Sequence, residues 1–200
     1  MMKLNSARLA WHDALYTPWD SQGSHIEQIG LLGCSVQKTE KSVNSRHAMQ
    51  QSISARIQHA IASLPDDLRA FGNHMYSPIA TDDEKDEAED LLFQVAYQNS
   101  SRLAVMSAAK MMRARYVCAA ILHRYRRINQ GGQGEGVDPL PTVFKLRVWI
   151  YDTYGIELPG DQWARDWGDF VGHCFDACNW LDKEALVPVS SAIKMMKEAA

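Results

Sequence analysis

Apolar residues recur every three or four positions through most of the chain, which is the spacing expected of amphipathic helices. The clearest example predicts a helix over residues 46–63, with an apolar stripe made of Met49, Ile53, Ile57, Ala60, Ile61 and Leu64. With capping residues and helix breakers as boundaries, the same spacing predicts further helices over residues 64–72, 81–97, 100–129, 142–153 and 161–185, and a short one beginning at Pro188 or Ser190.

Two segments depart from this pattern. In the first 45 residues glycines and Pro18 interrupt the sequence, so we expect a short helix over residues 6–16 followed by a loop-rich arm. Four glycines within residues 131–136, followed by Pro139 and Pro141, predict a linker. The expected organisation is therefore mainly α, with an N-terminal arm (1–45), a helical domain (46–130), a linker (131–141) and a C-terminal helical region (142–200).

Composition limits the class of protein. Two hundred residues with 46% hydrophobic and 22% charged residues are typical of a globular protein of one or two small domains. The longest apolar run, residues 116–122, is much shorter than the roughly 18 residues of a membrane span. The N-terminal residues lack the apolar region of a signal peptide. We therefore expect a cytoplasmic protein without a membrane partner.

The distribution of charge is the most informative feature. Residues 82–90 hold seven acids and one lysine, and the sequence from residue 102 to residue 127 then holds seven basic residues and no acid. Because the net charge of the chain is only -3, the basic segment is a local feature. Such a segment is typical of a surface that binds a polyanion or an acidic protein. Its basic residues are Arg102, Lys110, Arg113, Arg115, Arg124, Arg126 and Arg127.

A helical wheel arranges these cations if one helix carries them all. Five lie within about 100° of one another, whereas Arg115 and Arg126 project from the opposite side. Such a stripe can neutralise phosphates, and arginine can also bind guanine edges. The short turn QNSS after the acidic helix makes a helix-turn-helix possible. The alternative is a solvated helix whose arginines pair with the acids at 82–90, but the absence of interleaved acids favours nucleic acid.

The sequence contains no recognisable catalytic or metal-binding motif. The cysteines, Cys34, Cys118, Cys174 and Cys178, lack CxxC spacing, and the last two lie in an aromatic stripe, so we interpret them as buried thiols. Nothing resembles a phosphate-binding loop or a nucleophile motif. We therefore expect no cofactor, no metal and no small-molecule substrate, and a non-enzymatic protein. A site assembled from residues distant in sequence is the remaining enzymatic alternative.

Several segments together resemble a known family. These segments are RLAWHDAL and IGLLGC near the start, LRAFGNHMYSPIATDD, YVCAAILHRYRRINQGGQ, and CFDACNWLDKEALVPVSSAI near the end. They resemble pseudomonad prophage lysis-gene regulators of the Q-like transcription antiterminator kind. The resemblance implies a DNA-loaded factor that engages RNA polymerase and lets it read through a terminator, with Arg124, Arg126 and Arg127 at the nucleic acid. Some Q-like proteins carry a zinc-binding cysteine cluster, which this chain lacks.

The sequence therefore favours a DNA-binding transcription regulator with DNA and RNA polymerase as partners. The alternative is a helical adaptor protein of prophage origin whose basic helix binds an acidic protein.

Overall fold

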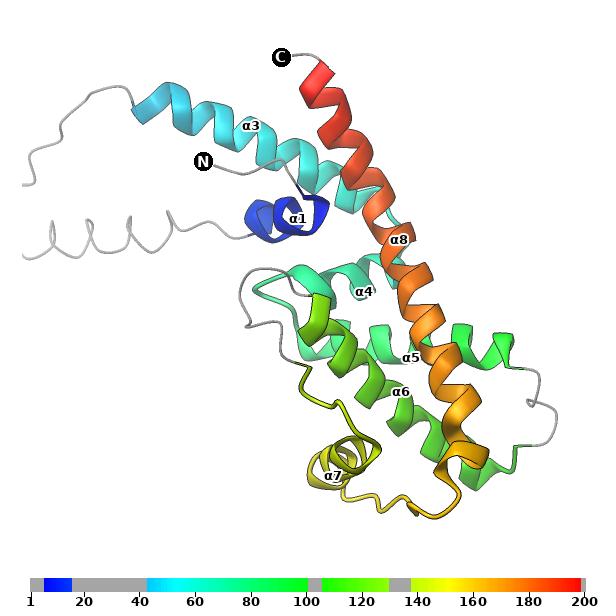
Figure 1. The fold of residues 1–200 in the computed structure, drawn as a ribbon. Helices are drawn as coiled ribbons and strands as arrows, with labels where there is room; N and C mark the ends of the chain where they lie inside the picture. The colour runs from blue at the N-terminus through cyan, green and yellow to red at the C-terminus, as the bar shows by residue number, and fades with distance from the viewer. Residues whose placement is uncertain (1–5, 16–42, 101–105, 130–137, 199–200) are drawn as a thin grey trace, which may run out of the picture.

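The computed structural model describes residues 6–15, 43–100, 106–129 and 138–198, and every regular element in these ranges is a helix (Figure 1). The prediction of a mainly helical fold is thus confirmed. None of the described helices is long and apolar enough to cross a membrane. The elements are α1 (Ala7–Leu15), α3 (Val43–Ala62), α4 (Asp66–Tyr76), α5 (Asp82–Asn99), α6 (Ala108–Asn129), α7 (Val143–Tyr154), the π-helical turn η2 (Ala164–Gly168) and α8 (Asp169–Glu198).

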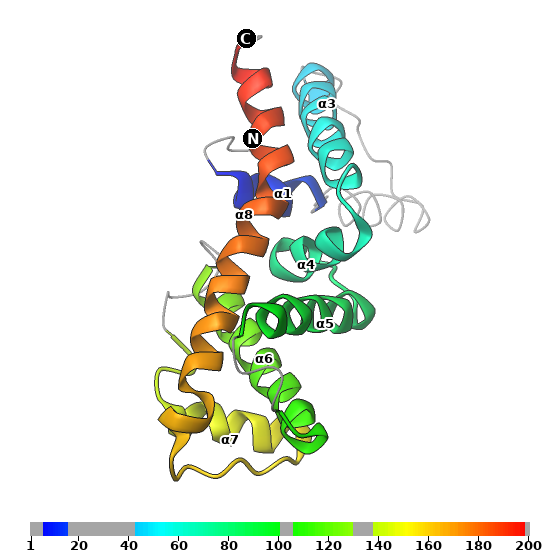
Figure 2. The same ribbon diagram turned by 90° about the vertical axis from the view of Figure 1, so that its right-hand side faces the viewer.

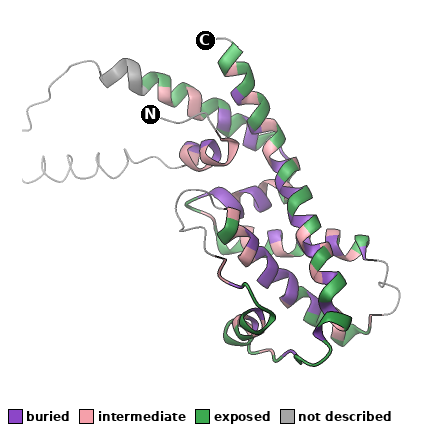
Figure 3. Cartoon of the chain, in the orientation of Figure 1, coloured by how far each residue is buried: buried purple, intermediate pink, exposed green. Residues whose placement is uncertain are grey.

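Helix α8 is the axis of the fold, because α1, α3, α4, α5 and α6 all pack along it. Figures 1 and 2 show α1 and α3 beside its C-terminal half, α4 and α5 beside its middle, and α6 beside its N-terminal half. Helix α7 contacts α6 and lies at the end of the molecule away from the C-terminus. Figure 3 shows that the middle of α6 is buried, whereas α7 is mainly exposed.

The described residues share one apolar core. It includes Phe71 of α4, Leu92 of α5, Ile121 of α6 and Leu181 of α8, none of which is more than 1% exposed. Helix α7 adds Ile150, which is fully buried. Residues from both predicted helical parts, before and after the linker, therefore contribute to the same core.

The prediction that a helix ends near residue 185 and a new one begins at Pro188 or Ser190 is wrong. Helix α8 continues through Pro188 for 30 residues in all. A proline within a helix removes one backbone hydrogen bond and usually kinks or ends the helix. Here the buried side chains of Ala185, Val189 and Ile193 lie on both sides of the proline. Packing of this half of α8 against α1 and α3 offsets the local cost.

The predicted helix end at Gly72 is also wrong. Helix α4 continues to Tyr76, so residues 73–76 are helical rather than a loop. Gly72 is required for a different reason, because a Cβ atom at this position would overlap the ring of Trp11 from α1. Trp11 is fully buried, and its Nε1 donates a hydrogen bond to Oδ1 of Asn73 at 3.2 Å. The glycine therefore permits close contact between α1 and α4.

Other helix boundaries lie close to the predicted ones and are defined by caps. Thr81 and Glu84 form a reciprocal capping box at the start of α5. Thr142 caps α7, which ends at Gly155 in the left-handed conformation with a φ of 68°. The predicted helix over residues 6–16 is confirmed by α1, whereas the predicted arm from residue 16 to residue 42 lies outside the described residues.

The connection between α5 and α6 differs from the prediction. Helix α5 ends at Asn99 and α6 begins only at Ala108, where Oγ of Ser107 accepts a hydrogen bond from the backbone of Lys110. The four-residue turn QNSS expected for a helix-turn-helix is therefore not what joins the two helices. Ser100 is instead buried at the C-terminus of α5.

We expect Gly72→Ala to lower the free energy of unfolding by about 2 kcal/mol, because overpacking outweighs the gain in helix propensity. Urea denaturation measures this loss. In a Trp11→Phe background, which removes ring atoms that the new methyl group would meet, the same substitution should cost much less. An equal cost in both backgrounds would contradict the proposed role of the glycine.

Candidate functional site

Cationic side chains from two helices gather at the C-terminal end of α6. We call Lys85 of α5 with His123, Arg126 and Arg127 of α6 the terminal cationic cluster. Their proximity is visible in the pKa of His123, which is lowered by burial and then by the charges of Arg127, Arg126 and Lys85. Beneath the cluster lies His74 of α4. Burial, Arg126, Lys85 and His123 together lower the pKa of His74 to about 3.

The packing of α5 against α6 creates this cluster. Asp90, in the middle of α5, meets Arg115 in the N-terminal half of α6, while Lys85 lies near the other end of α6. The two helices therefore run antiparallel, and the start of α5 lies beside the end of α6. Basic side chains in the last turn of a helix also interact favourably with its dipole.

Arg126 is the unusual member of the cluster. Its Nε atom is buried and has no hydrogen-bond partner among the described residues. Burial lowers the pKa of its guanidinium, and the positive charge of Arg127 lowers it further. A buried cationic donor without an acceptor typically costs 1–3 kcal/mol or more. An anion bound at this place would supply the missing acceptor and the missing negative charge.

The other members of the cluster differ in how far their charge is compensated. Nζ of Lys85 lies 3.6 Å from Oε1 of Glu89. Arg127 is exposed and forms no ion pair with any described residue. Within the described part of the chain, Arg126 and Arg127 therefore carry the positive charge of this surface that no carboxylate compensates.

Arg124 belongs to the fold rather than to an open surface. Its Nε donates to both carboxylate oxygens of Asp138, at 3.0 and 3.1 Å, and its Nη2 donates to one of them at 2.6 Å. The guanidinium also lies 5.3 Å from the ring centroid of Phe175 on α8. The hydrogen bond from Arg124 is the largest cause that lowers the pKa of Asp138. Arg124 thus fastens the segment before α7 to α6.

Arg115 is paired as the alternative interpretation of the basic segment predicts. It forms an ion pair with Asp90, one of the acids at 82–90, and its guanidinium lies 4.6 Å from the ring centroid of Phe93. Both charged side chains are more than half exposed, so the pair contributes little to stability. The charge of Arg115 is nevertheless compensated by Asp90.

The remaining predicted residues lie away from the cluster. Nζ of Lys110 lies 5.5 Å from the ring centroid of Trp167, and Arg113 is exposed. Arg102 lies outside the described residues. Residues 117–122 are all buried beneath the neighbouring helices, so the cations of α6 are divided between its two ends. Arg113 and Arg127 are about 20 Å apart along the axis, and no continuous open stripe joins them.

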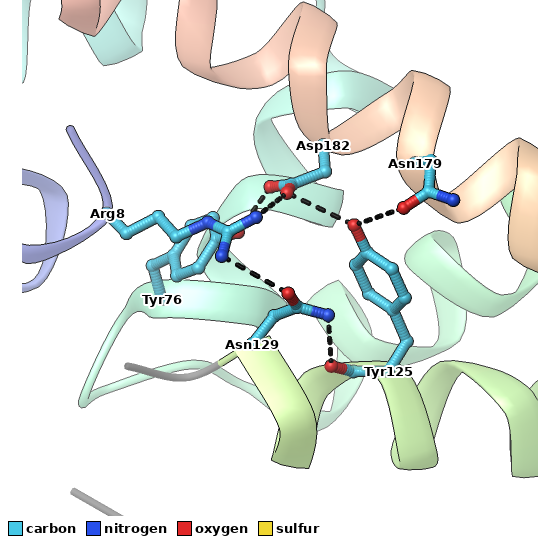
Figure 4. A network of polar contacts seen from close by, with 6 residues as sticks. All are labelled: Arg8, Tyr76, Tyr125, Asn129, Asn179 and Asp182. Carbon is cyan, nitrogen blue, oxygen red and sulfur yellow. Dashed lines mark hydrogen bonds and ion pairs between the residues drawn. The ribbon is translucent and has the colours of Figure 1, made fainter. Parts of the chain in front are cut away.

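A buried polar network that the sequence analysis missed joins four helices (Figure 4). Its centre is the carboxylate of Asp182 on α8, a residue only 3% exposed. This carboxylate accepts hydrogen bonds from the hydroxyls of Tyr76 and Tyr125 and forms an ion pair with Arg8 at 2.5 Å. Asn129 accepts from Arg8 at 3.2 Å and donates to the carbonyl of Tyr125 at 3.0 Å.

This network holds the core together. A shallow groove of about 570 Å³ beside it is lined by Arg8, Tyr125 and Asp182, among others. Burial, and then the charge of Asp182 and its hydrogen bond, raise the pKa of Tyr125 well above its usual range, so the tyrosine remains a donor. One feature of the sequence could have indicated this network. Asp182 lies on the same helix face as Cys178 and Ala185, and an acid on a buried face needs hydrogen-bond partners.

The described cysteines are buried and free, as the sequence predicts. Sγ of Cys118 lies 3.4 Å from Sγ of Cys174, a contact distance rather than a disulfide bond. Burial raises the pKa of Cys118 and of Cys178. Within the described ranges, no three His, Cys, Asp or Glu side chains are grouped so that they could hold a metal ion. Cys34 lies outside those ranges.

We expect Arg124→Gln to lower the free energy of unfolding by about 1–2 kcal/mol, because it removes a charge-assisted bidentate contact that is partly screened by solvent. Arg127→Gln, three residues away on the same helix, is the matched control and should change stability by less than about 0.5 kcal/mol. Urea denaturation measures both. Equal effects of the two substitutions would refute the structural role of Arg124.

His74 should make the protein sensitive to acid. The unfolded chain binds a proton near pH 6.5, whereas the folded protein does so only near pH 3, so the unfolded state holds more protons between these values. The free energy of unfolding should therefore fall with decreasing pH in this window, by up to about 1.4 kcal/mol per pH unit. Urea denaturation at several pH values should show a shallower fall for His74→Gln. His59→Gln, at an exposed position, is the control, and an unchanged slope in His74→Gln would disprove this assignment.

Comparisons with known proteins give no match, whether with family models, curated proteins or solved structures. The resemblance to Q-like antiterminators thus receives no support from them and stays an expectation. The function of the chain is therefore inferred from its own residues. The most informative of these are the basic residues of the terminal cationic cluster.

Proposed function

We propose that the protein is a non-enzymatic transcription regulator that binds DNA through the terminal cationic cluster. The observation that carries this proposal is the state of Arg126, a half-buried guanidinium whose buried Nε has no acceptor among the described residues and whose charged neighbour is Arg127. Phosphate oxygens are strong acceptors and carry the opposite charge. A DNA backbone beside the exposed part of this guanidinium would therefore offer it acceptors and reduce the repulsion between the two arginines.

The proposed contact is with phosphates rather than with base edges. The middle of α6 is buried, so this helix cannot lie along a major groove in the way a recognition helix does. Its last turn, with Arg126 and Arg127, is open to a partner, and its other exposed residues lie at the opposite end of the helix. Binding through a few phosphates depends on charge and counterion release, and it is largely independent of DNA sequence.

The regulatory part of the proposal is transcription antitermination, with RNA polymerase as the second partner. It rests on the resemblance of the sequence to Q-like antiterminators. Exposed acids of α5, such as Asp83, Asp86 and Glu87, are a suitable contact for a basic surface of the polymerase. Phosphate contact by the cluster would keep the factor on DNA while this second contact forms.

One observation favours a second candidate, a helical adaptor whose basic surface binds an acidic protein. Ile128, next to Arg127, is 42% exposed. Arginine beside an exposed apolar side chain is typical of protein interfaces. In this case the same two arginines would pair with carboxylates of the partner.

The DNA proposal predicts a salt-dependent affinity for duplex DNA of arbitrary sequence, measured by fluorescence anisotropy between about 50 and 200 mM salt. Replacing both Arg126 and Arg127 by glutamine should weaken binding and reduce the slope of log K against log salt by about 2. The matched control replaces Lys194 and Lys197 of α8 by glutamine, which removes the same charge elsewhere and should leave the slope unchanged.

An absence of DNA binding by the unaltered protein at low salt would sink the DNA proposal. A second arm then separates the candidates. The protein is used to capture purified RNA polymerase with and without nuclease. Capture that survives nuclease and is lost on replacing Arg126 and Arg127 supports the adaptor, whereas capture that requires DNA supports the regulator. Equal binding by the double variant and the lysine control would overturn both.

A further inference from the structure

Helix α7 carries an apolar face that no described residue covers. Phe144, Val148 and Tyr151 are 69%, 39% and 58% exposed. Their spacing of four and three residues places them on one side of the helix. The opposite side, with Leu146 and Ile150, is buried against the body of the protein. The exposed side is therefore a stripe of large apolar side chains, on a helix that is coloured mainly as exposed in Figure 3.

A pocket lies beside this stripe. Arg147 donates a hydrogen bond from Nε to the carbonyl of Leu158 at 2.5 Å, which holds the segment after α7 along one edge of the helix. The resulting pocket has a volume of about 300 Å³, and its lining includes Phe144, Tyr151 and Leu158. It offers room for an aromatic side chain of a partner, and the stripe itself supplies such side chains.

The other edge of the stripe carries one charge of each sign. Lys145 lies near the start of α7 and Asp152 near its end, and both side chains are exposed. They are about 10 Å apart along the axis, too far to pair with each other. Neither forms an ion pair with another described residue. Both charges thus remain available to a partner.

This arrangement is complementary to itself in one orientation. When two copies of α7 pack antiparallel, the same edge of each helix faces the same edge of the other. Lys145 of each copy then meets Asp152 of the other copy, so the symmetry produces two equivalent ion pairs. Parallel packing would instead place the Lys145–Asp152 edges of the two helices on opposite sides of the interface, so that these charges would not meet.

We propose that this face is a homodimer interface, in which α7 packs antiparallel against α7 of a second copy of this chain. Phe144 and Tyr151 of one copy enter the pocket region of the other, and the Lys145–Asp152 pairs fix the orientation. A contact centred on one helix pair is small, so the dimer is a reversible one at the weak end of protein interfaces. The inference is independent of the proposed function, because the terminal cationic cluster takes no part in it.

Sedimentation equilibrium of the full chain over a range of concentrations tests the proposal. The unaltered protein should show a reversible monomer–dimer equilibrium. Tyr151→Ala removes a central aromatic side chain and should weaken the dimer about tenfold or more. Because Tyr151 is exposed in the monomer, its loss should leave the helical circular dichroism unchanged. A protein that is monomeric at all concentrations would overturn the proposal and leave this face to another partner.

Charge reversal tests the orientation with its own control. Lys145→Glu alone and Asp152→Lys alone should each weaken the dimer, because like charges then face each other. An equimolar mixture of the two variants should form a heterodimer, since every facing pair in it is opposite in sign. If both variants dimerise as the unaltered protein does, or if the mixture gains nothing over either variant, the antiparallel α7 interface is wrong.

Discussion

The fold depends on one buried carboxylate. Asp182 lies in the middle of α8, the helix on which five others pack, and it is held by donors from three of them: Arg8, Tyr76 and Tyr125. A buried ion without such partners would destabilise the protein by several kcal/mol. The same contacts fix how α1, α4 and α6 sit on α8, and hence where the end of α6 emerges. The position of the terminal cationic cluster follows from this network.

The basic residues of α6 differ in whether a carboxylate compensates their charge. Arg124 is compensated by Asp138 and Arg115 by Asp90, so both charges already have a carboxylate partner. Arg126 and Arg127 lack a carboxylate partner among the described residues, and Arg126 is partly desolvated as well. A feature that looks like one basic stripe in the sequence thus includes two paired arginines, Lys110 and Arg113 at one end of α6, and a small open cluster at the other end. The proposal of an anionic partner rests on this cluster.

The sequence predicted what local chemistry decides and missed what distant contacts decide. Helical spacing located the helices, and the boundaries near Thr81 and Gly155 were close to correct because these residues act on their own backbone. Gly72 and Pro188 misled the prediction, because Gly72 packs against Trp11 and the helix that contains Pro188 packs against α1 and α3. The basic residues themselves could be predicted, but their partners could not: no local pattern pairs Arg124 with Asp138 across a glycine-rich segment.

The central claim is that Arg126 and Arg127 are open to an anionic partner while Arg115 and Arg124 are not. Nitrogen-15 spectra of the arginine Nε–H groups, recorded during a titration with duplex DNA, test it most directly. The account predicts that the signals of Arg126 and Arg127 move with added DNA and that those of Arg115 and Arg124 stay in place. Movement of the Arg124 signal with Arg126 unchanged, or no movement at all, would contradict it.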